Sequence, residues 1–191
     1  MEEVLQAKPE TDFTVRAYVD GLSPGKHYYY RFLGAEGSAS RVGRTRTAPD
    51  PDDATPVNFG FTSCQNFEQA FYGGWARMLE DDRALPEGQR LQFILHLGDF
   101  IYERCWHTRI DGSPQSRTLP PFPDGVTTDE NRYAISLADY RHLYRTYLDD
   151  PHLQDARANW PFICTWDDHE FANNAFQAYS TYADKALLEP R

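Results

Sequence analysis

The alternation of apolar and polar residues divides the chain into two unlike halves. In the first half, apolar side chains recur at every second position over 13–19 and again over 28–32. A period of two residues is that of a strand with one buried face, so both segments are predicted to be β-strands, with a third over 38–47. From residue 56 onward, short apolar runs alternate with segments of helical spacing. This second pattern predicts an α/β layer fold.

The second half contains three apolar runs that predict strands and two segments that predict helices. The runs are 57–62, 91–97 and 161–165, and the helical segments are 69–80 and one that carries Leu137, Tyr140, Tyr144, Tyr147 and Leu148. Ser136 and Asp139 have the spacing of a capping box at the start of the later helix. The stretch 104–135 is rich in Pro, Gly, Ser, Thr and Asp. Segments of that length without structure are usually functional loops or flexible insertions.

One short motif joins the first two predicted strands. Residues 22–28, Leu-Ser-Pro-Gly-Lys-His-Tyr, have the Leu-x-Pro-x-x-x-Tyr order of the tyrosine corner in Ig-like sandwiches. In that corner the tyrosine hydroxyl bonds back to the backbone. A plain hairpin with a tyrosine packed on one face is the alternative. Because three strands cannot bury both inner faces of a sandwich, we expect this segment to be the last part of such a domain.

Composition and charge exclude several classes of protein. The 191 residues are 40% hydrophobic and 15% aromatic, which is too apolar for a disordered chain. No apolar run approaches the about 20 residues of a transmembrane helix, and the acidic, polar first residues do not form a signal peptide. A formal net charge of −10 argues against a nucleic-acid-binding surface, which carries a basic stripe.

Polar clusters follow the three strands predicted in the second half. They are Ser-Cys-Gln at 63–65, Gly-Asp-Phe-Ile-Tyr-Glu at 98–103 and Trp-Asp-Asp-His-Glu at 166–170. Ligands of open α/β sheets bind at the carboxyl ends of strands, so the three clusters are expected to converge. Together they offer a thiol, a phenol, carboxylates and an imidazole. Phenolate with thiolate suits a trivalent, Lewis-acidic iron better than Mg2+ or Ca2+, which prefer carboxylate and carbonyl oxygens.

Each of these residues also has a purely structural interpretation. Asp99 could belong to an ordinary turn, and Cys64 could be a buried small hydrophobe. We adopt the structural interpretation for Cys164, which lies inside an apolar run, and for His96 within a strand. Cys105 has no evident partner, and the spacing of the cysteines excludes a zinc ribbon or a thioredoxin-type site. The functional interpretation rests on the conjunction of three clusters at three successive strand ends.

The order of these motifs resembles that of PhoD-like alkaline phosphatases and phosphodiesterases. It runs Ser-Cys-Gln, His-Leu-Gly-Asp-x-x-Tyr-Glu, Asp-Tyr-Arg at 139–141, and Thr-Trp-Asp-Asp-His-Glu followed by Asn-Asn. The resemblance covers essentially the whole chain, because 42–49 is similar to the end of that family's N-terminal domain. It implies that residues 1–50 are the last strands of an Ig/fibronectin-like β-sandwich. It also implies that 56–191 form the N-terminal half of a metallophosphoesterase-type α/β sandwich, the catalytic domain of the family.

The resemblance also implies roles for individual residues. Cys64, Asp99 and Tyr102 would bind ferric iron (Fe3+), and Asp99 would bridge to calcium (Ca2+). Asp168 would be a ligand of the second metal and, with His169, a catalytic residue. His169 would contact the phosphate or aid the leaving group. No role is assigned to Asp167, Glu170, Asn173, Asn174 and Arg141. Because the family's later His-containing metal motifs lie downstream, the chain is expected to be an internal fragment with part of the ligand set.

The predicted function is hydrolysis of phosphate mono- or diesters by a metal-activated hydroxide. Bound cations would turn the acidic site from repelling phosphate to attracting it. The full-length protein is expected to be periplasmic or secreted, without a membrane span. One alternative is another metallophosphoesterase, such as a purple acid phosphatase, although those proteins use an aspartate where Cys64 stands. The other is an inactive fragment or a non-catalytic Ig-like binding or adhesion module with a degenerate α/β partner.

Overall fold

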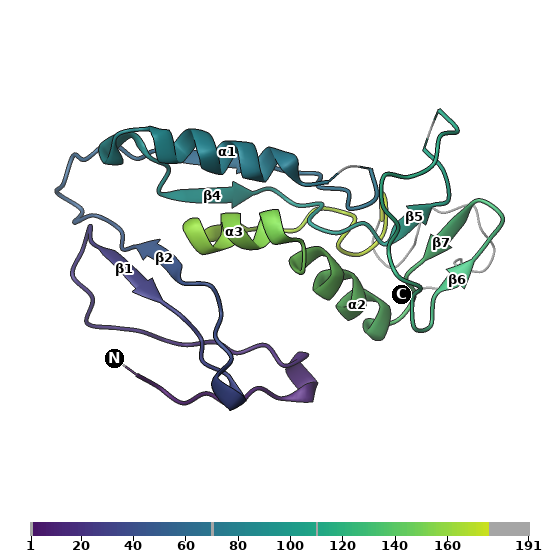
Figure 1. Cartoon of the computed structure of the whole chain (residues 1–191), viewed down its shortest axis with the longest axis horizontal. Helices are drawn as coiled ribbons and strands as arrows, with labels where there is room; N and C mark the ends of the chain where they lie inside the picture. Colours follow the sequence, from purple (N-terminus) through teal and green to yellow (C-terminus); the bar gives the residue numbers. More distant parts are fainter. Residues whose placement is uncertain (1, 70, 110, 176–191) are drawn as a thin grey trace.

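The computed structural model describes residues 2–69, 71–109 and 111–175 and has a mixed α/β fold (Figure 1). Its α-helices are α1 (Gly73–Ala84), α2 (Leu137–Leu148) and α3 (Pro151–Asn159). One sheet pairs β1 (His27–Tyr30) with β2 (Gly43–Arg46), and a second has the order β3 (Phe59–Thr62), β4 (Phe93–His96), β8 (Phe162–Cys164). The third has the order β5 (Arg104–Trp106), β7 (Asn131–Tyr133), β6 (Val126–Thr127). Short 3-10 turns lie at Pro9–Thr11, Ala35–Gly37 and Glu87–Gln89.

The β3–β4–β8 sheet is parallel and aligns the three strand ends. Thr62 at the end of β3 pairs with His96 at the end of β4, which pairs with Cys164 at the end of β8. The chain therefore leaves all three strands at the same edge. This confirms the three predicted strands of the second half and the expected convergence of the polar clusters that follow them.

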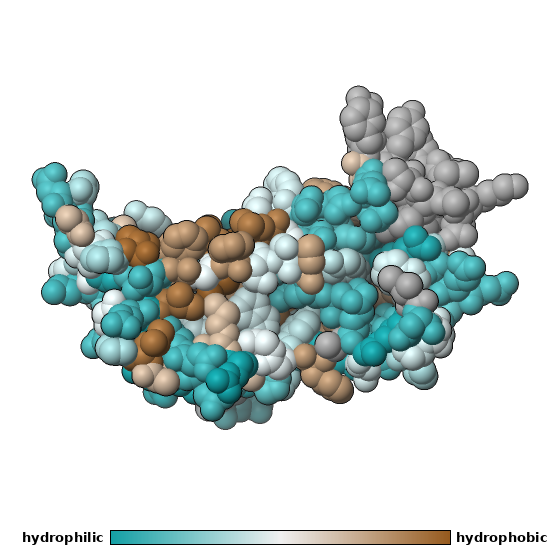
Figure 2. Space-filling model, turned by 90° about the horizontal axis from the view of Figure 1, so that it is seen from above, coloured by the Kyte–Doolittle hydropathy of each residue, from teal (hydrophilic) through white to brown (hydrophobic). Residues whose placement is uncertain are grey.

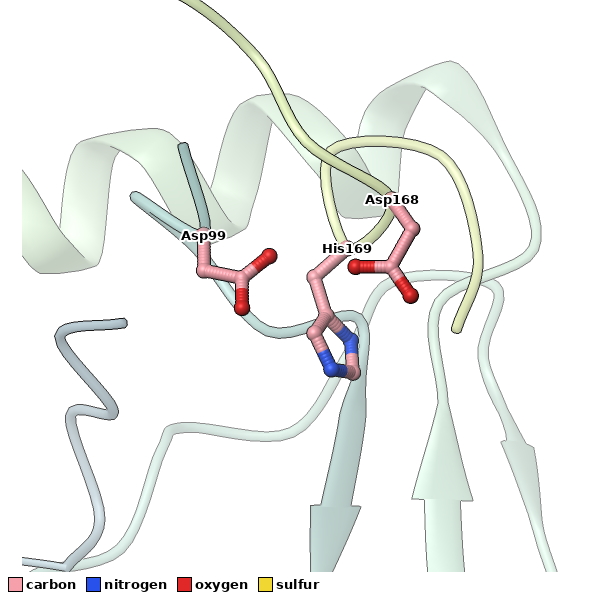
Figure 3. Close-up of side chains that lie close together, drawn as sticks. All are labelled: Asp99, Asp168 and His169. Atoms are coloured by element: carbon pink, nitrogen blue, oxygen red, sulfur yellow. The ribbon is translucent and has the colours of Figure 1, made fainter. Parts of the chain in front are cut away.

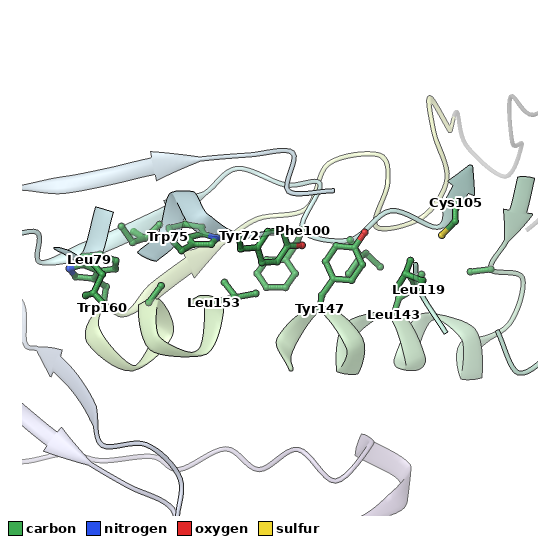
Figure 4. Close-up of a cluster of buried hydrophobic side chains, with 14 residues drawn as sticks. Tyr72, Trp75, Leu79, Phe100, Cys105, Leu119, Leu143, Tyr147, Leu153 and Trp160 are labelled. Carbon is green, nitrogen blue, oxygen red and sulfur yellow. The ribbon is translucent and has the colours of Figure 1, made fainter. Parts of the chain in front are cut away.

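One face of this sheet is covered by helices. Trp75 of α1, Ile94 and Trp160 are buried there, and Trp75 and Trp160 are labelled in Figure 4. The ring of Trp75 lies 5.3 Å from that of Phe162. Gly60 faces the same layer, where a Cβ atom would lie 2.7 Å from the Met78 side chain. A larger residue at this position would require the ends of the Met78 and Ile94 side chains to move.

The other face of the sheet is open in the described chain. The side chains of Phe59, Phe61 and Ile163 are 47%, 72% and 56% exposed. Along the strands their positions alternate with the buried ones, as the pleat requires. Figure 2 shows hydrophobic side chains gathered along one long side of the molecule. Cys164, predicted to be buried, is instead exposed at the end of β8.

The N-terminal segment forms the antiparallel β1–β2 pair. Tyr28 accepts a hydrogen bond from the backbone N–H of Ser23 at 2.8 Å, which is the bond that the tyrosine-corner motif predicts. The prediction of a strand over 13–19 is wrong, since this segment pairs with no described strand. The side chain of Phe13 is 63% exposed, and its backbone has a φ of 57°. Alternation predicts a strand only when a neighbouring strand and a layer to cover one face are both present.

Ionic contacts attach this segment to the helices. Arg145 of α2 pairs with Asp12 at 2.5 Å, and Arg41 pairs with Asp155 of α3 at 2.6 Å. Arg141 of α2 donates to the carbonyl of Glu10. Arg141, whose role was left unassigned, therefore contacts the N-terminal segment in the described chain.

The stretch 104–135, expected to lack structure, instead contains the β5–β7–β6 sheet. Arg132 of β7 pairs with Glu68 at 2.7 Å, and Arg117 pairs with Asp150 at 2.5 Å, with all four side chains largely buried. These two ion pairs join the stretch to the core. Asp150 also caps α3, a helix that periodicity did not predict.

The helix expected over 69–80 begins at Gly73, and its predicted apolar face is present, with Trp75 and Leu79 buried. The predicted capping box of Ser136 and Asp139 is confirmed. His96 is fully buried and its ring lies 4.9 Å from that of Phe100. Burial lowers the pKa of His96 to about 4, which favours the neutral imidazole, and its structural interpretation stays a prediction. No described helix has the length and apolar character needed to cross a membrane.

Candidate metal centre

Three of the predicted ligands meet at one carboxylate oxygen. The Sγ atom of Cys64 lies 3.3 Å from Oδ2 of Asp99, and the hydroxyl of Tyr102 lies 3.2 Å from the same atom. Cys64 follows β3, whereas Asp99 and Tyr102 follow β4. The backbone holds Cys64 and Asp99 in the left-handed region, with φ of 59° and 54°. Two non-glycine residues in this region indicate a loop shape maintained by its surroundings.

The chemistry of these atoms fits a cation. Oδ1 of Asp99 is buried and has no hydrogen-bond partner among the described residues. Burial raises the pKa of Asp99, although the Cys64 thiol offsets part of this effect. Burial and the neighbouring Asp99 raise the pKa of Tyr102 well above that of a free phenol. A positive charge between these groups would reverse both effects, because cations favour deprotonated ligands.

Asp168 and His169 bring further donor atoms to the same place. Ligand atoms of Asp99, Asp168 and His169 all lie within 4.8 Å of one another (Figure 3). The two loops that carry them follow β4 and β8. His169, expected to act on the phosphate or the leaving group, therefore also lies within the range of a metal ligand.

The carboxylate of Glu103 hydrogen-bonds the ring of His169 and fixes its position. Its Oε2 atom lies 2.7 Å from Nδ1 of His169, and its Oε1 atom accepts from the backbone N–H of Asn173 at 2.7 Å. Burial lowers the pKa of His169, but the hydrogen bond and charge of Glu103, together with Asp99 and Asp168, outweigh this and raise it. Since Nδ1 is engaged by Glu103, Nε2 is the ring nitrogen left for the site. Sequence reasoning quoted Glu103 within a motif but gave it no function.

Glu170 joins the two loops. One of its oxygens accepts from the backbone N–H of Phe100 at 2.6 Å, and the other accepts from Asp99 at 3.2 Å and Asp167 at 2.8 Å. Sequence reasoning placed Glu170 near the site without a role. The only signal was an ionisable residue that directly follows the predicted metal ligands.

Residues in the third cluster and just after it contribute backbone hydrogen bonds. Asn174 donates its N–H to the carboxylate of Asp168 at 2.5 Å. Burial raises the pKa of Asp168, but this hydrogen bond and the nearby His169 lower it further than burial raises it. Asp167 donates to Glu170 and is exposed, while Asn173 donates to Glu103. These contacts support the positions of Asp168 and His169.

Comparison with known proteins identifies the family. The family model of PhoD-like phosphatases matches residues 59–189, and that of the PhoD-like phosphatase N-terminal domain matches residues 1–49. The chain belongs to the PhoD-like phosphatase family. It is 36% identical over 169 residues to alkaline phosphatase D of Bacillus subtilis, an alignment that covers 88% of this chain and 26% of that protein.

A solved PhoD structure supports the same assignment. It matches with a TM-score of 0.76 and 33% identity over 93% of this chain and 31% of that one. The chain thus spans between a quarter and a third of the length of these two PhoD-like relatives. The mixed α/β fold is that of the matching part of PhoD. A non-catalytic binding module, the alternative considered from sequence, is not favoured by these matches.

Proposed function

We propose that this chain provides the first part of the metal centre of a phosphoesterase that hydrolyses phosphate mono- or diesters. One observation carries the proposal: the side chains of Cys64, Asp99, Tyr102, Asp168 and His169 converge at the carboxyl edge of the parallel sheet. That edge is where α/β sheets bind ligands. The chain's place among the PhoD-like phosphatases supplies the reaction class.

The donor atoms divide between two kinds of cation. The thiol of Cys64 and the phenol of Tyr102, with Asp99 between them, suit Fe3+, whereas the carboxylates of Asp99 and Asp168 suit Ca2+ or another divalent metal. When bound, such metals supply Lewis acidity, which activates water and screens the charge of the phosphate. Without cations the carboxylates of Asp99 and Asp168 repel an anionic substrate. The excess of acidic residues in the chain thus becomes part of the binding site.

His169 is the residue proposed to handle protons. Glu103 fixes Nδ1, so Nε2 is free to hydrogen-bond a substrate oxygen or to donate a proton to the departing oxygen. The raised pKa of His169 favours the protonated ring that such a donation needs. The ring of Tyr102, tilted against the imidazole with 4.2 Å between the ring centroids, restrains the imidazole further. The imidazole therefore needs little reorganisation when a substrate binds.

The open face of the β3–β4–β8 sheet fits one layer of a metallophosphoesterase-type sandwich. We propose residues 56–191 as the first half of that catalytic domain, and residues 1–50 as the last strands of an Ig/fibronectin-like domain. The exposed rings of Phe59 and Phe61 support this, because a contiguous apolar surface of this kind is usually covered. The remaining ligands would come from the additional sequence of a family-length protein.

An Asp99→Asn substitution tests the proposal in such a family-length protein. Hydrolysis of a bis-aryl phosphate should fall at least about 100-fold, because the loss of a bridging carboxylate removes several kcal/mol of charge stabilisation. Asp81→Asn is the matched control, since Asp81 lies exposed on α1 and pairs with Arg77. Circular dichroism checks that both variants fold. Turnover retained by a folded Asp99→Asn variant would contradict the assigned site.

A further inference from the structure

The loops that carry Asp99 and Asp168 meet backbone to backbone at Gly98. A Cβ atom on Gly98 would lie 2.5 Å from both the backbone nitrogen and the Cβ of Asp167. Gly98 also has a φ of +105°, which side chains rarely adopt. The two loops are therefore in direct contact, and a shift at this junction changes the spacing between Asp99 and Asp168.

A single carboxylate accepts three hydrogen bonds at this junction, two of them from the other loop. Glu170 follows β8, yet it accepts from the N–H groups of Asp99 and Phe100, which follow β4. It also accepts from the N–H of Asp167 in its own loop at 2.8 Å. Both oxygens of Glu170 accept from backbone donors, so three of the about four lone-pair sites of the carboxylate hold the backbone. Hydrogen bonds to a charged acceptor are stronger than those between neutral groups.

The loop after β4 needs such a restraint. Asp99 is held at a φ of 54°, a region that disfavours residues with a Cβ atom. If this backbone relaxed toward an ordinary conformation, Oδ2 of Asp99 would leave the position where it meets Cys64 and Tyr102. The N–H bonded to Glu170 belongs to Asp99 itself, so the restraint acts at the strained residue.

We infer that Glu170 is a positioning residue that fixes the spacing between Asp99 and the Asp168–His169 pair without binding a metal itself. The inference rests on the proposed metal centre for its functional meaning. Its structural content, that one carboxylate joins the two loops through three amides, is independent of any metal. The two parts can therefore be tested separately.

Glu170→Gln in the family-length protein is the test, because the new NH2 group replaces an acceptor where three N–H donors converge. Amide hydrogen exchange should become at least about tenfold faster around Asp99, Phe100 and Asp167. The affinity for Mn2+ or Ca2+, measured by calorimetry, should fall about tenfold, as it does when outer contacts of metal ligands are removed. Glu80→Gln, on the exposed surface of α1 beside Arg77, is the matched control and should change neither quantity.

The exchange and metal-affinity results together decide whether Glu170 positions the metal ligands. Unchanged exchange at the three amides overturns the inference, and so does faster exchange with unchanged metal affinity, which would make Glu170 merely structural. If the unsubstituted protein binds neither cation, the proposed metal centre fails, and the exchange result alone decides whether Glu170 holds the loops together. Should Glu170→Gln not fold, exchange in the unsubstituted protein decides. Slow exchange of Asp99 and Phe100, which lie outside any helix or strand, supports the inference, and fast exchange overturns it.

Discussion

Nδ1 of His169 lies 2.7 Å from the carboxylate of Glu103, whose side chain is fully buried. The second oxygen of Glu103 is held by the backbone of Asn173, so the carboxylate cannot turn away from the imidazole without losing that bond. A buried acceptor on one ring nitrogen fixes both the orientation of the ring and the nitrogen it presents to a ligand. The proposed chemistry of His169 at Nε2 therefore depends on Glu103, which engages the other ring nitrogen.

Replacing Glu103 with Gln should lower the pKa of His169. The substitution removes the negative charge that stabilises the imidazolium, while burial, which lowers this pKa, remains. Histidine NMR titration of the metal-free protein measures the change. The exposed Asp81→Asn substitution is the control and should leave the titration of His169 where it is.

Because Glu103 raises the pKa of His169, the stability of the folded protein should depend on pH. The folded state raises the pKa of His169, so its contribution to stability is present below the unfolded value of about 6.5 and disappears as the pH rises through the folded value. The free energy of unfolding of the metal-free protein should therefore decrease across that window, and Glu103→Gln should flatten the decrease. Urea unfolding on either side of the window checks this. An equal slope for both proteins would contradict it.

Tyr102 and Cys64 should have separable effects on iron. A ferric ion bound to a phenolate has a visible charge-transfer absorption, so Tyr102→Phe should remove the phenolate band of the Fe3+-loaded protein and leave the absorption of the Cys64 thiolate. Cys64→Ser should lower iron content at least about tenfold, because the soft thiolate is replaced by a weakly acidic hydroxyl. Tyr144→Phe is the control, since Tyr144 stacks on Phe100 and lies outside the ligand set. Metal analysis and visible spectroscopy distinguish these variants.

Gly98→Ala should destabilise the protein by about 2 kcal/mol or more, because the new methyl group meets Asp167 at a strained φ. Gly73→Ala is the matched control, because nothing lies within 4 Å of a Cβ there and its φ is ordinary. Replacing a helical glycine with alanine should stabilise by up to about 1 kcal/mol. Thermal unfolding of both variants provides the comparison. Equal melting temperatures would mean that the two loops do not touch at Gly98.

The ion pair of Arg132 and Glu68 should matter for the stability of the 104–135 stretch. Arg132→Met leaves Glu68 buried beside an apolar side chain and should cost about 3 kcal/mol. Adding Glu68→Gln removes the uncompensated charge and should recover much of the loss. Chemical denaturation of the single and double variants measures the coupling. Additive effects would contradict a direct pairing.

Much of the α/β part could be predicted because its signals are local. The strands β3, β4 and β8 are apolar runs, and α2 begins at a capping box that one turn of sequence encodes. The β5–β7–β6 sheet could not be predicted, because its strands are too short to alternate and depend on the distant Glu68–Arg132 pair. The helix α3 was missed, although Asp150 followed by Pro151 is an ordinary start signal.

Part of the candidate site could likewise be predicted from local sequence, and part could not. Parallel strands carry whatever follows them to one edge, which is why Cys64, Asp99 and Asp168 could be named from strand ends alone. Glu103 and Glu170 were not assigned because their roles depend on burial and on backbone donors contributed by another loop. Spacing along the chain contains neither kind of information.

The left-handed backbone at Cys64 has an evolutionary consequence. Asparagine and aspartate occupy that conformation more readily than other residues with a Cβ atom, so an oxygen donor could replace the sulfur there without rebuilding the loop. The proposed ligand atom at position 64 and the shape of the loop can therefore change independently. An asparagine or aspartate at position 64 would thus change the proposed metal ligand and keep the loop around it.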